Sequence, residues 1–237
     1  MCIRDSAYAL DANTTASYCT AVGKDALSSN TTGTANTSVG YDALEVNSTG
    51  AQNTAVGSQS LASNTTASNN TAVGYYALLS NTDGYANTAV GAEAGDAVTT
   101  GDFNVFVGKA AGGATTTADA NTAVGESAFV ANTTGANNVA MGANALGSNT
   151  TADSNVAIGK SAGYAITTGG NNVAIGATAG DGTVTTGGGN IIVGYGSELG
   201  GAGQENEIVI ATNSAGKGSS TASVSYTHLT LPTILRV

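Results

Sequence analysis

Apolar and polar residues follow one another along this chain in a pattern that repeats. A segment reading N-T-A-V-G, or a close variant, opens at Asn36 and returns every 17 residues until Asn172, and one further step of 18 residues leads to Asn190. Each unit continues with two variable residues, A-L, two more variable residues, N-T-T-G and a last variable pair. Self-similarity at a fixed period is the signature of a repeat architecture. We number positions 1 to 17 of each unit from its opening asparagine.

Position 4 is apolar in every unit, and position 5 is glycine. A β-branched residue before a glycine predicts a short strand that ends at a corner where φ is positive. Such strands, stacked in parallel about 4.8 Å apart, form a solenoid. The sequence therefore predicts an all-β fold, a parallel β-roll or β-solenoid of about twelve 17-residue coils over residues 7–195. The position-4 residues are Val39, Val56, Val73, Val90, Val107, Val124, Met141, Ile158, Ile175 and Val193.

The asparagines at position 1 fall into a single column of such a stack. A column of asparagines stabilises stacked β structure because each side-chain amide can bond to the coils on either side. The sequence therefore predicts a structural ladder along the length of the solenoid. Its members are Asn36, Asn53, Asn70, Asn87, Asn104, Asn121, Asn138, Asn155, Asn172 and Asn190.

Positions 9 and 12 vary together. Units with Leu or Phe at position 9 carry Asn at position 12, as in Leu44 and Asn47, whereas units with Gly at position 9 carry Val, Thr or Ile, as in Gly95 and Val98. Because protein interiors are close-packed, we expect the two positions to share one small interior volume. The segment between the corner glycine and position 12 is compatible with either a second strand or a single helical turn.

Position 3 is almost always alanine, and this bears on oligomeric state. If the position-4 side of the strand faces the core, the position-3 column lies on the outer face, where a solvent-facing strand would carry polar residues. A column of small residues there predicts close approach by another copy of the chain. From Val139 onward position 2 also changes from Thr to Val or Ile. We therefore expect a parallel homotrimer. The column holds Ala55, Ala72, Ala89, Ala123, Ala140, Ala157 and Ala174, with Phe106 and Ile192 as larger exceptions.

Both ends of the chain depart from the repeat. A DNA segment that encodes Met1–Asp5 reads on its opposite strand as Val-Ser-Tyr-Thr-His, which is Val224–His228. The two ends resemble sequencing-adapter DNA translated in opposite directions. We therefore expect residues 1–6 to be adapter-derived and not native, and residues 223–237 to be adapter-derived and either disordered or non-native, so that no native N-terminus is present in which a signal could be sought. Residues 196–222 are then a Gly-rich transition or capping segment with a strand over 206–211.

Composition restricts the chemistry that the chain can perform. The sequence has 34 glycines, no tryptophan, and 16 acidic against 6 basic residues, for a net charge of −10. This charge argues against nucleic acid as a partner, and no apolar run approaches the roughly 20 residues needed for membrane insertion. The only histidine, His228, lies in the adapter-like tail. Both arginines, Arg4 and Arg236, also lie in the adapter-like ends. Without histidine or arginine in the remaining segment, the usual general bases, zinc sites and phosphate clamps lack their residues. We predict a non-enzymatic protein with no catalytic, metal-binding or cofactor-binding residues and no cofactor.

Two sets of side chains are candidates for surface contact. Tyr41, Tyr75, Tyr76 and Tyr85 lie at variable positions in neighbouring coils. Their rings could stack on sugars, or they pack against each other or against a neighbouring copy. The adjacent threonines at positions 13 and 14 form a second column, which suggests an ice-binding surface or a stacked column of turns. Extended geometry would point adjacent residues to opposite faces, which favours the column of turns.

The segments "NTAVG", "NTTGAN" and "NNVAIG" resemble the head repeats of trimeric autotransporter adhesins and, more closely, the related repeats of phage tail fibres and bacterial fibre proteins. The resemblance covers nearly all of residues 7–222, although this 17-residue coil is longer than that of adhesin heads. It implies a non-enzymatic structural or adhesive fibre segment, located on a virion or at the cell surface, that acts as a rigid spacer and as a display for host-surface contact. The implied partners are two further copies of the chain and a host-surface glycan or protein receptor. The alternatives are an ice-binding β-solenoid and a tail-spike polysaccharide hydrolase.

Overall fold

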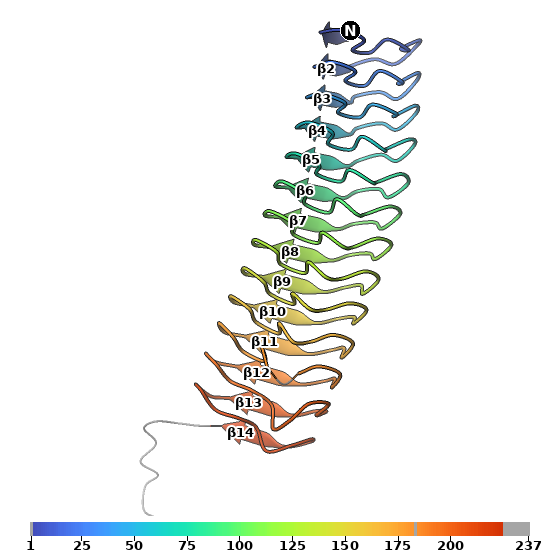
Figure 1. Ribbon diagram of the computed structural model, residues 1–237. Coiled ribbons are helices and arrows are strands. Elements are labelled where there is room, and N and C mark those ends of the chain that lie inside the picture. Colours follow the sequence, from blue (N-terminus) through green and yellow to red (C-terminus); the bar gives the residue numbers. More distant parts are fainter. Residues whose placement is uncertain (1, 183, 225–237) are drawn as a thin grey trace, which may run out of the picture.

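The structure is a computed structural model that describes residues 2–182 and 184–224. It is a single stack of coils in which a 14-stranded sheet runs from one end to the other in chain order (Figure 1). Every strand has three residues, and each pairs in parallel with the next. The strands are β1 Ile3–Asp5, β2 Thr20–Val22, β3 Thr37–Val39, β4 Thr54–Val56, β5 Thr71–Val73, β6 Thr88–Val90, β7 Val105–Val107, β8 Thr122–Val124, β9 Val139–Met141, β10 Val156–Ile158, β11 Val173–Ile175, β12 Ile191–Val193, β13 Ile208–Ile210 and β14 Ala222–Val224.

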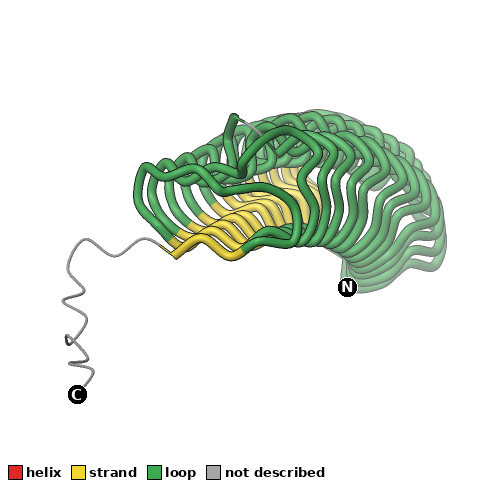
Figure 2. The backbone as a smooth tube through the Cα atoms, turned by 90° about the horizontal axis from the view of Figure 1, so that it is seen from below, coloured by secondary structure: helices red, strands yellow, loops and turns green. Residues whose placement is uncertain are grey.

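The strand register repeats without slippage. Thr54 pairs with Thr71 and Ala55 pairs with Ala72, so one sequence repeat corresponds to one coil. The 18-residue step is absorbed outside the sheet, because Val173 still pairs with Ile191. All strands lie on one wall of the stack, and the remainder of each coil consists of turns that close the opposite wall (Figure 2). The predicted all-β parallel solenoid is confirmed.

The segment that follows the corner glycine is neither a strand nor a helical turn. It is a run of turns with left-handed residues at positions 7 and 9, such as Asp42 at φ 54° and Leu44 at φ 50°. The corner itself requires glycine for two reasons. Gly57 has φ of 140°, and a Cβ built on it would overlap the carbonyl oxygen of Gly74 in the next coil. Backbone therefore stacks directly on backbone at this corner.

The strands face the opposite way from the predicted orientation. The position-3 residue of each strand points into the core, so Ala55 and Ala72 are fully buried, whereas the position-4 residue Val56 is 36% exposed. The prediction that the alanine column lies on the outer surface is wrong. The reason is the thinness of the coil interior. The inward side chain of the strand meets the position-9 and position-12 side chains of the opposite wall, and a methyl group is all that fits beside a leucine.

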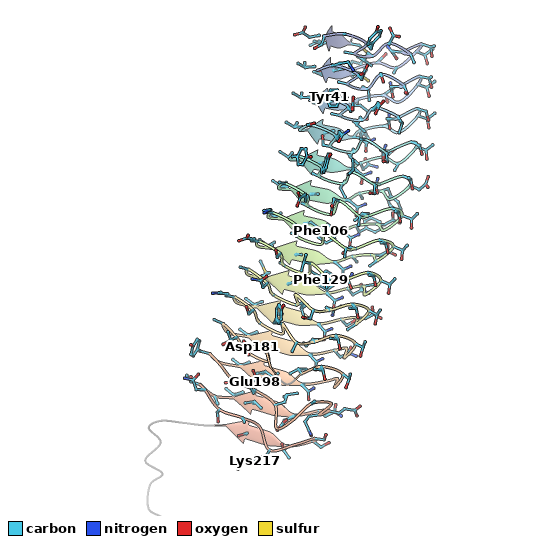
Figure 3. All side chains as sticks on the ribbon, in the orientation of Figure 1. Tyr41, Phe106, Phe129, Asp181, Glu198 and Lys217 are labelled. Atoms are coloured by element: carbon cyan, nitrogen blue, oxygen red, sulfur yellow. The ribbon has the colours of Figure 1, made fainter. Side chains whose placement is uncertain are left out.

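The interior is one continuous apolar column with few large side chains. Within a coil, the alanines at positions 3 and 8 pack beside the position-9 residue, which is leucine in several coils. Phe106 and Phe129 are the largest fully buried side chains, and they lie within the coils rather than on their surface (Figure 3). A Cβ on Gly163 would contact Ile166 at 3.0 Å and Leu146 at 3.1 Å. Positions 9 and 12 therefore share one interior volume, as the sequence pattern predicts.

The two ends continue the stack over part of their length. Ile3–Asp5 pairs with β2 and Ala222–Val224 pairs with β13, both in register. The Gly-rich segment before β14 forms less regular coils, and its predicted strand over 206–211 is present as β13. Residues 225–237, which include His228 and most of the adapter-like tail, lie outside the described residues.

Candidate functional surfaces

The position-1 asparagines form a buried ladder that ties each coil to the next. The backbone N–H of Asn53 donates to Oδ1 of Asn36 over 2.9 Å, and Nδ2 of Asn53 donates to the carbonyl oxygen of Ala67 over 2.8 Å. The same pair of bonds recurs along the column up to Asn190, whose N–H donates to Asn172 Oδ1. All ten predicted members are at least 99% buried. Their side-chain amides form hydrogen bonds with backbone groups, so the column is structural and presents no free group to a ligand.

A second ladder runs through position 12. Nδ2 of Asn47 donates to Oδ1 of Asn30 over 2.8 Å, and Nδ2 of Asn64 donates to Oδ1 of Asn47 over 2.7 Å. The ladder ends where the next coil carries Val98 or Ile166 instead of asparagine. The preceding Oδ1 atoms, on Asn81 and Asn149, are buried without a hydrogen-bond partner. Interior filling by an apolar residue therefore interrupts the ladder and leaves an unsatisfied oxygen.

Glu207 occupies position 1 in the coil after Asn190, and it is the last residue of the position-1 ladder. Its N–H donates to Asn190 Oδ1 over 2.9 Å. The carboxylate accepts hydrogen bonds from Gly200 N at 3.0 Å, Gly218 N at 2.8 Å and Thr221 Oγ1 at 3.1 Å. Burial alone would raise the pKa of Glu207, but these hydrogen bonds outweigh burial and lower it. The carboxylate is therefore an internal hydrogen-bond acceptor in a buried side chain, and it is turned away from any external cation.

Cys19 occupies the same position near the other end of the chain. Its side chain is buried, and Sγ lies 3.3 Å from the carbonyl oxygen of Gly33, in the place of an asparagine amide. Burial raises the pKa of the thiol, which disfavours the reactive thiolate. This cysteine substitutes for a ladder residue.

The threonine column is a column of turns. At position 13 the hydroxyl donates to the carbonyl oxygen of the same position in the next coil, for example from Thr99 to Thr116 over 3.2 Å. The neighbouring position-14 residues, such as Thr100 and Thr117, are exposed. Adjacent threonines thus have different environments, and only one row faces solvent.

The outer side of the sheet is an apolar surface that sequence reasoning missed, because it assigned these residues to the core. We call positions 2 and 4 of strands β2–β13 the outer strand face. In β2–β8 position 2 is threonine except for Val105, and from β9 onward both positions are apolar. The most exposed members of the second half are Met141 at 42%, Ile158 at 40%, Ile175 at 38%, Ile191 at 38% and Ile210 at 44%.

Aromatic side chains gather at the two edges of this face. Tyr75 and Tyr76 stack with ring centroids 3.8 Å apart, and Tyr85 meets Phe103 edge-on at 4.8 Å. Tyr41 is separate and lies under Lys24, whose Nζ is 5.3 Å from the ring centroid. Three of the four predicted tyrosines thus belong to pairs. Phe103 was missed, although its place one residue later in the repeat than Tyr85 is the signal that could have found it.

Charged groups are scattered along the coil edges. The pKa values of Asp96 and Glu45 are raised, in both cases mainly by partial burial. Within residues 2–182 and 184–224, no three histidine, cysteine or acidic side chains come together as metal ligands, and no pocket is present. The same residues contain no helix long and apolar enough to cross a bilayer.

No family model, curated protein or solved structure gives a significant match to this chain.

Proposed function

We propose that the chain is a non-enzymatic segment of an extracellular fibre, a phage tail fibre or a bacterial surface adhesin, that serves as a rigid spacer and a display surface. The observation that supports this most is the uninterrupted stack. Every coil is joined to the next by the strand ladder, by the position-1 asparagines and by backbone hydrogen bonds at the turns, such as Leu61 N to Ala77 O at 3.0 Å. About twelve coils at about 4.8 Å each give a rod on the order of 60 Å long.

The hydrogen bonds between coils run along the rod axis. A load applied along the axis would therefore be shared by several parallel columns of bonds in every coil. Side chains at variable positions, by contrast, change from coil to coil without disturbing the stack. This separation of a closely packed interior from a variable surface suits a spacer that also presents contact residues.

Three parallel copies are proposed to associate through the outer strand face. The apolar residues at position 4, joined from β9 onward by apolar residues at position 2, form an exposed apolar surface that favours a protein partner. A second copy is the occupant that fits best, because only a parallel stack with the same spacing can interleave its side chains with these columns over the full length. Closed symmetry with the faces turned inward buries Ile158, Ile175 and their neighbours around one axis.

Electron microscopy of the full chain tests the fibre function. We expect straight or gently curved particles about 60 Å long, with threefold class averages when viewed along the rod. Globular or collapsed particles would contradict a spacer role. Mutation of the exposed position-14 threonines should leave the particles unchanged, because those side chains face solvent.

Ice binding is a second candidate, favoured by one feature of the outer strand face. Position 2 carries threonine in six of the strands β2–β8, with one threonine per coil from β2 to β6 and Val105 interrupting the row at β7. A regularly spaced row of hydroxyl groups of this kind can order water. Thermal hysteresis by the monomeric chain, lost when Thr54 and Thr71 are changed to lysine, would favour this candidate. If a monomer with an exposed strand face shows no thermal hysteresis, ice binding is excluded.

A further inference from the structure

The two aromatic pairs stand at opposite ends of the same group of strands. Tyr75 and Tyr76 follow β5 at positions 6 and 7, directly after the corner glycine. Tyr85 and Phe103 precede β6 and β7 at positions 16 and 17. Each pair therefore lies just outside the outer strand face, one at the edge where the strands end and one at the edge where they begin.

The rings are not needed by the fold. Tyr75 is 48% exposed, Tyr85 is 43% exposed and Phe103 is 53% exposed. An earlier part of the solenoid has small or polar residues at these positions without any change in strand register. The corresponding residues are Ser58, Gln59, Ala51 and Gln52. Exposed aromatic rings grouped in pairs on a chain with so few aromatics indicate a binding function.

Trimeric association brings the two pairs into one groove. In a cyclic trimer with the strand faces inward, the edge where the strands of one copy end lies beside the edge where the strands of the next copy begin. Tyr75 and Tyr76 of one copy then face Tyr85 and Phe103 of its neighbour, within one or two coil heights. The groove repeats three times around the rod, so each trimer holds three equivalent sites.

The charges around the pairs define the class of ligand. Glu93 lies in the coil after Tyr76 at the same position, and it contributes to a raised pKa of Tyr75, which results first from the hydrogen bond with Tyr76. Asp102 precedes Phe103, and its Oδ1 accepts a hydrogen bond from Tyr85 N over 2.8 Å. Acidic neighbours repel nucleic acids and acidic sugars, but they accept hydrogen bonds from hydroxyl groups.

We propose that these two aromatic pairs, supplied by neighbouring copies, form a binding site for an uncharged polysaccharide, with pyranose rings stacked on the aromatic faces. The proposal rests on the trimer and the adhesive function proposed above, and it specifies their ligand. Three identical grooves on a rigid rod give the avidity that shallow stacking sites need.

The test uses two double variants that copy residues from the earlier coil. Tyr75→Ser/Tyr76→Gln removes the first pair, and Tyr85→Ala/Phe103→Gln removes the second. The left-handed positions 7 and 17 already hold Gln59 and Gln52 at φ 56° and 59°, so these changes suit the backbone. Tyr195→Ser, at position 6 of a coil outside the proposed groove, is the matched control.

Binding is measured on immobilised neutral glucans, galactans and mannans, with sulfated galactan as the anionic comparison. We expect the wild-type trimer and the Tyr195→Ser variant to bind a neutral polysaccharide. Each double variant should lose about tenfold or more in apparent affinity, since loss of stacking is worth roughly 1.4 kcal/mol or more. Binding to the anionic polymer alone, or binding of a neutral polysaccharide by both double variants with the affinity of the wild-type trimer, would overturn the proposal.

Mixed trimers separate a shared site from a site within one copy. Trimers assembled from both double variants contain one groove in which an intact first pair meets an intact second pair, whereas neither homotrimer has any. We expect the mixed trimers to regain binding above both homotrimers. A lack of rescue would show that the site is not shared. Sedimentation of the same samples reports the trimer independently, so a failure of association is distinguished from a failure of glycan binding.

Discussion

The ring of Phe106 fills the interior space that a side chain on Gly112 would occupy. A Cβ on Gly112 would lie 2.5 Å from Cε1 of Phe106, and one on Gly95, in the preceding coil, would lie 2.7 Å from Cδ2. In the coils of Ala55 and Ala72, by contrast, alanine stands at position 3 and leucine, Leu61 or Leu78, stands at position 9. The same interior volume is thus filled either by a large side chain on the strand or by a leucine on the opposite wall.

Phe106→Ala and Gly112→Leu should each destabilise the solenoid, and the two changes together should partly compensate. Removal of a buried phenylalanine ring costs about 3–5 kcal/mol, and overpacking costs about 1–3 kcal/mol. The double variant restores the alanine–leucine arrangement of a regular coil. A double-mutant cycle by urea unfolding should give a coupling energy of opposite sign to the single losses. Simple additivity would contradict a shared volume.

Substitution at the corner glycine should be more harmful than substitution elsewhere in the coil. Gly57→Ala places a methyl group against the Gly74 carbonyl at a φ of 140°, so we expect a loss well above 1 kcal/mol. Gly113→Ala is the control, because Ala62 and Val130 occupy the same position in other coils. Its effect should lie within about 1 kcal/mol of zero in thermal unfolding. Equal losses would show that backbone stacking does not constrain the corner.

Substitution in the position-12 asparagine ladder should cost more stability in the middle of the ladder than at a residue where the ladder is interrupted. Nδ2 of Asn64 donates to Oδ1 of Asn47, and Oδ1 of Asn64 accepts from Nδ2 of Asn81 over 3.0 Å. Asn64→Ala therefore removes one hydrogen bond from each buried neighbour: Asn47 Oδ1 loses its donor, and Asn81 Nδ2 keeps only its bond to Gly84 O. Each costs about 1–3 kcal/mol. Asn149 has an unpaired Oδ1 and a single long bond of 3.4 Å, so Asn149→Ala should cost clearly less. Denaturant midpoints of the two variants provide the comparison, and a larger loss at Asn149 would refute the ladder as a source of stability.

Acid should loosen the C-terminal coils through Glu207. Its pKa is lower in the folded chain than in the unfolded chain, so its stabilising effect is present above the ordinary glutamate pKa and is lost as pH falls through the lowered value. Hydrogen exchange of the amides around Gly200 and Gly218, followed from neutral pH to below pH ~4, should show protection disappearing in that range. Glu207→Gln should weaken protection at neutral pH and remove this pH dependence. Exposed Glu205→Gln should change neither.

Much of this architecture can be predicted from the sequence because a repeat of nearly constant length fixes the register. Once Asn36 and Asn53 are aligned, the strand pairings from β2 to β12 follow, as do the columns of asparagine and threonine. The pairings of β1 and β14 do not follow, because their residues lie outside the repeat. The direction of each strand face does not follow, because Ala55 and Val56 are both apolar. Which of them is buried depends on the space left by Leu44 and Leu61 on the opposite wall, and that is a tertiary property. The consecutive turns were also unpredictable, since leucine at φ near 50° opposes its intrinsic preference.

The candidate surfaces, too, could be predicted only in part from the sequence. Tyr41, Tyr75, Tyr76 and Tyr85 stand out by residue type alone. The partner of Tyr85 does not stand out by type, because Phe103 reaches Tyr85 through the stacking of two coils and is found only when their repeat positions are compared. The outer strand face was hidden by the incorrect orientation of the strands, although the change from threonine to valine or isoleucine at β9 was visible in the sequence.

Sedimentation equilibrium of the full chain decides whether the outer strand face joins copies. One chain has a mass of 22.8 kDa, so a trimer should give 3 × 22.8 = 68.4 kDa. Ile158→Lys/Ile175→Lys, which puts charges into the apolar half of the face, should give folded monomers. The control Thr134→Lys/Thr151→Lys, at exposed turn positions, should remain trimeric. A folded wild-type monomer at every concentration, or a trimer that survives lysines on the strand face, would contradict association through this face.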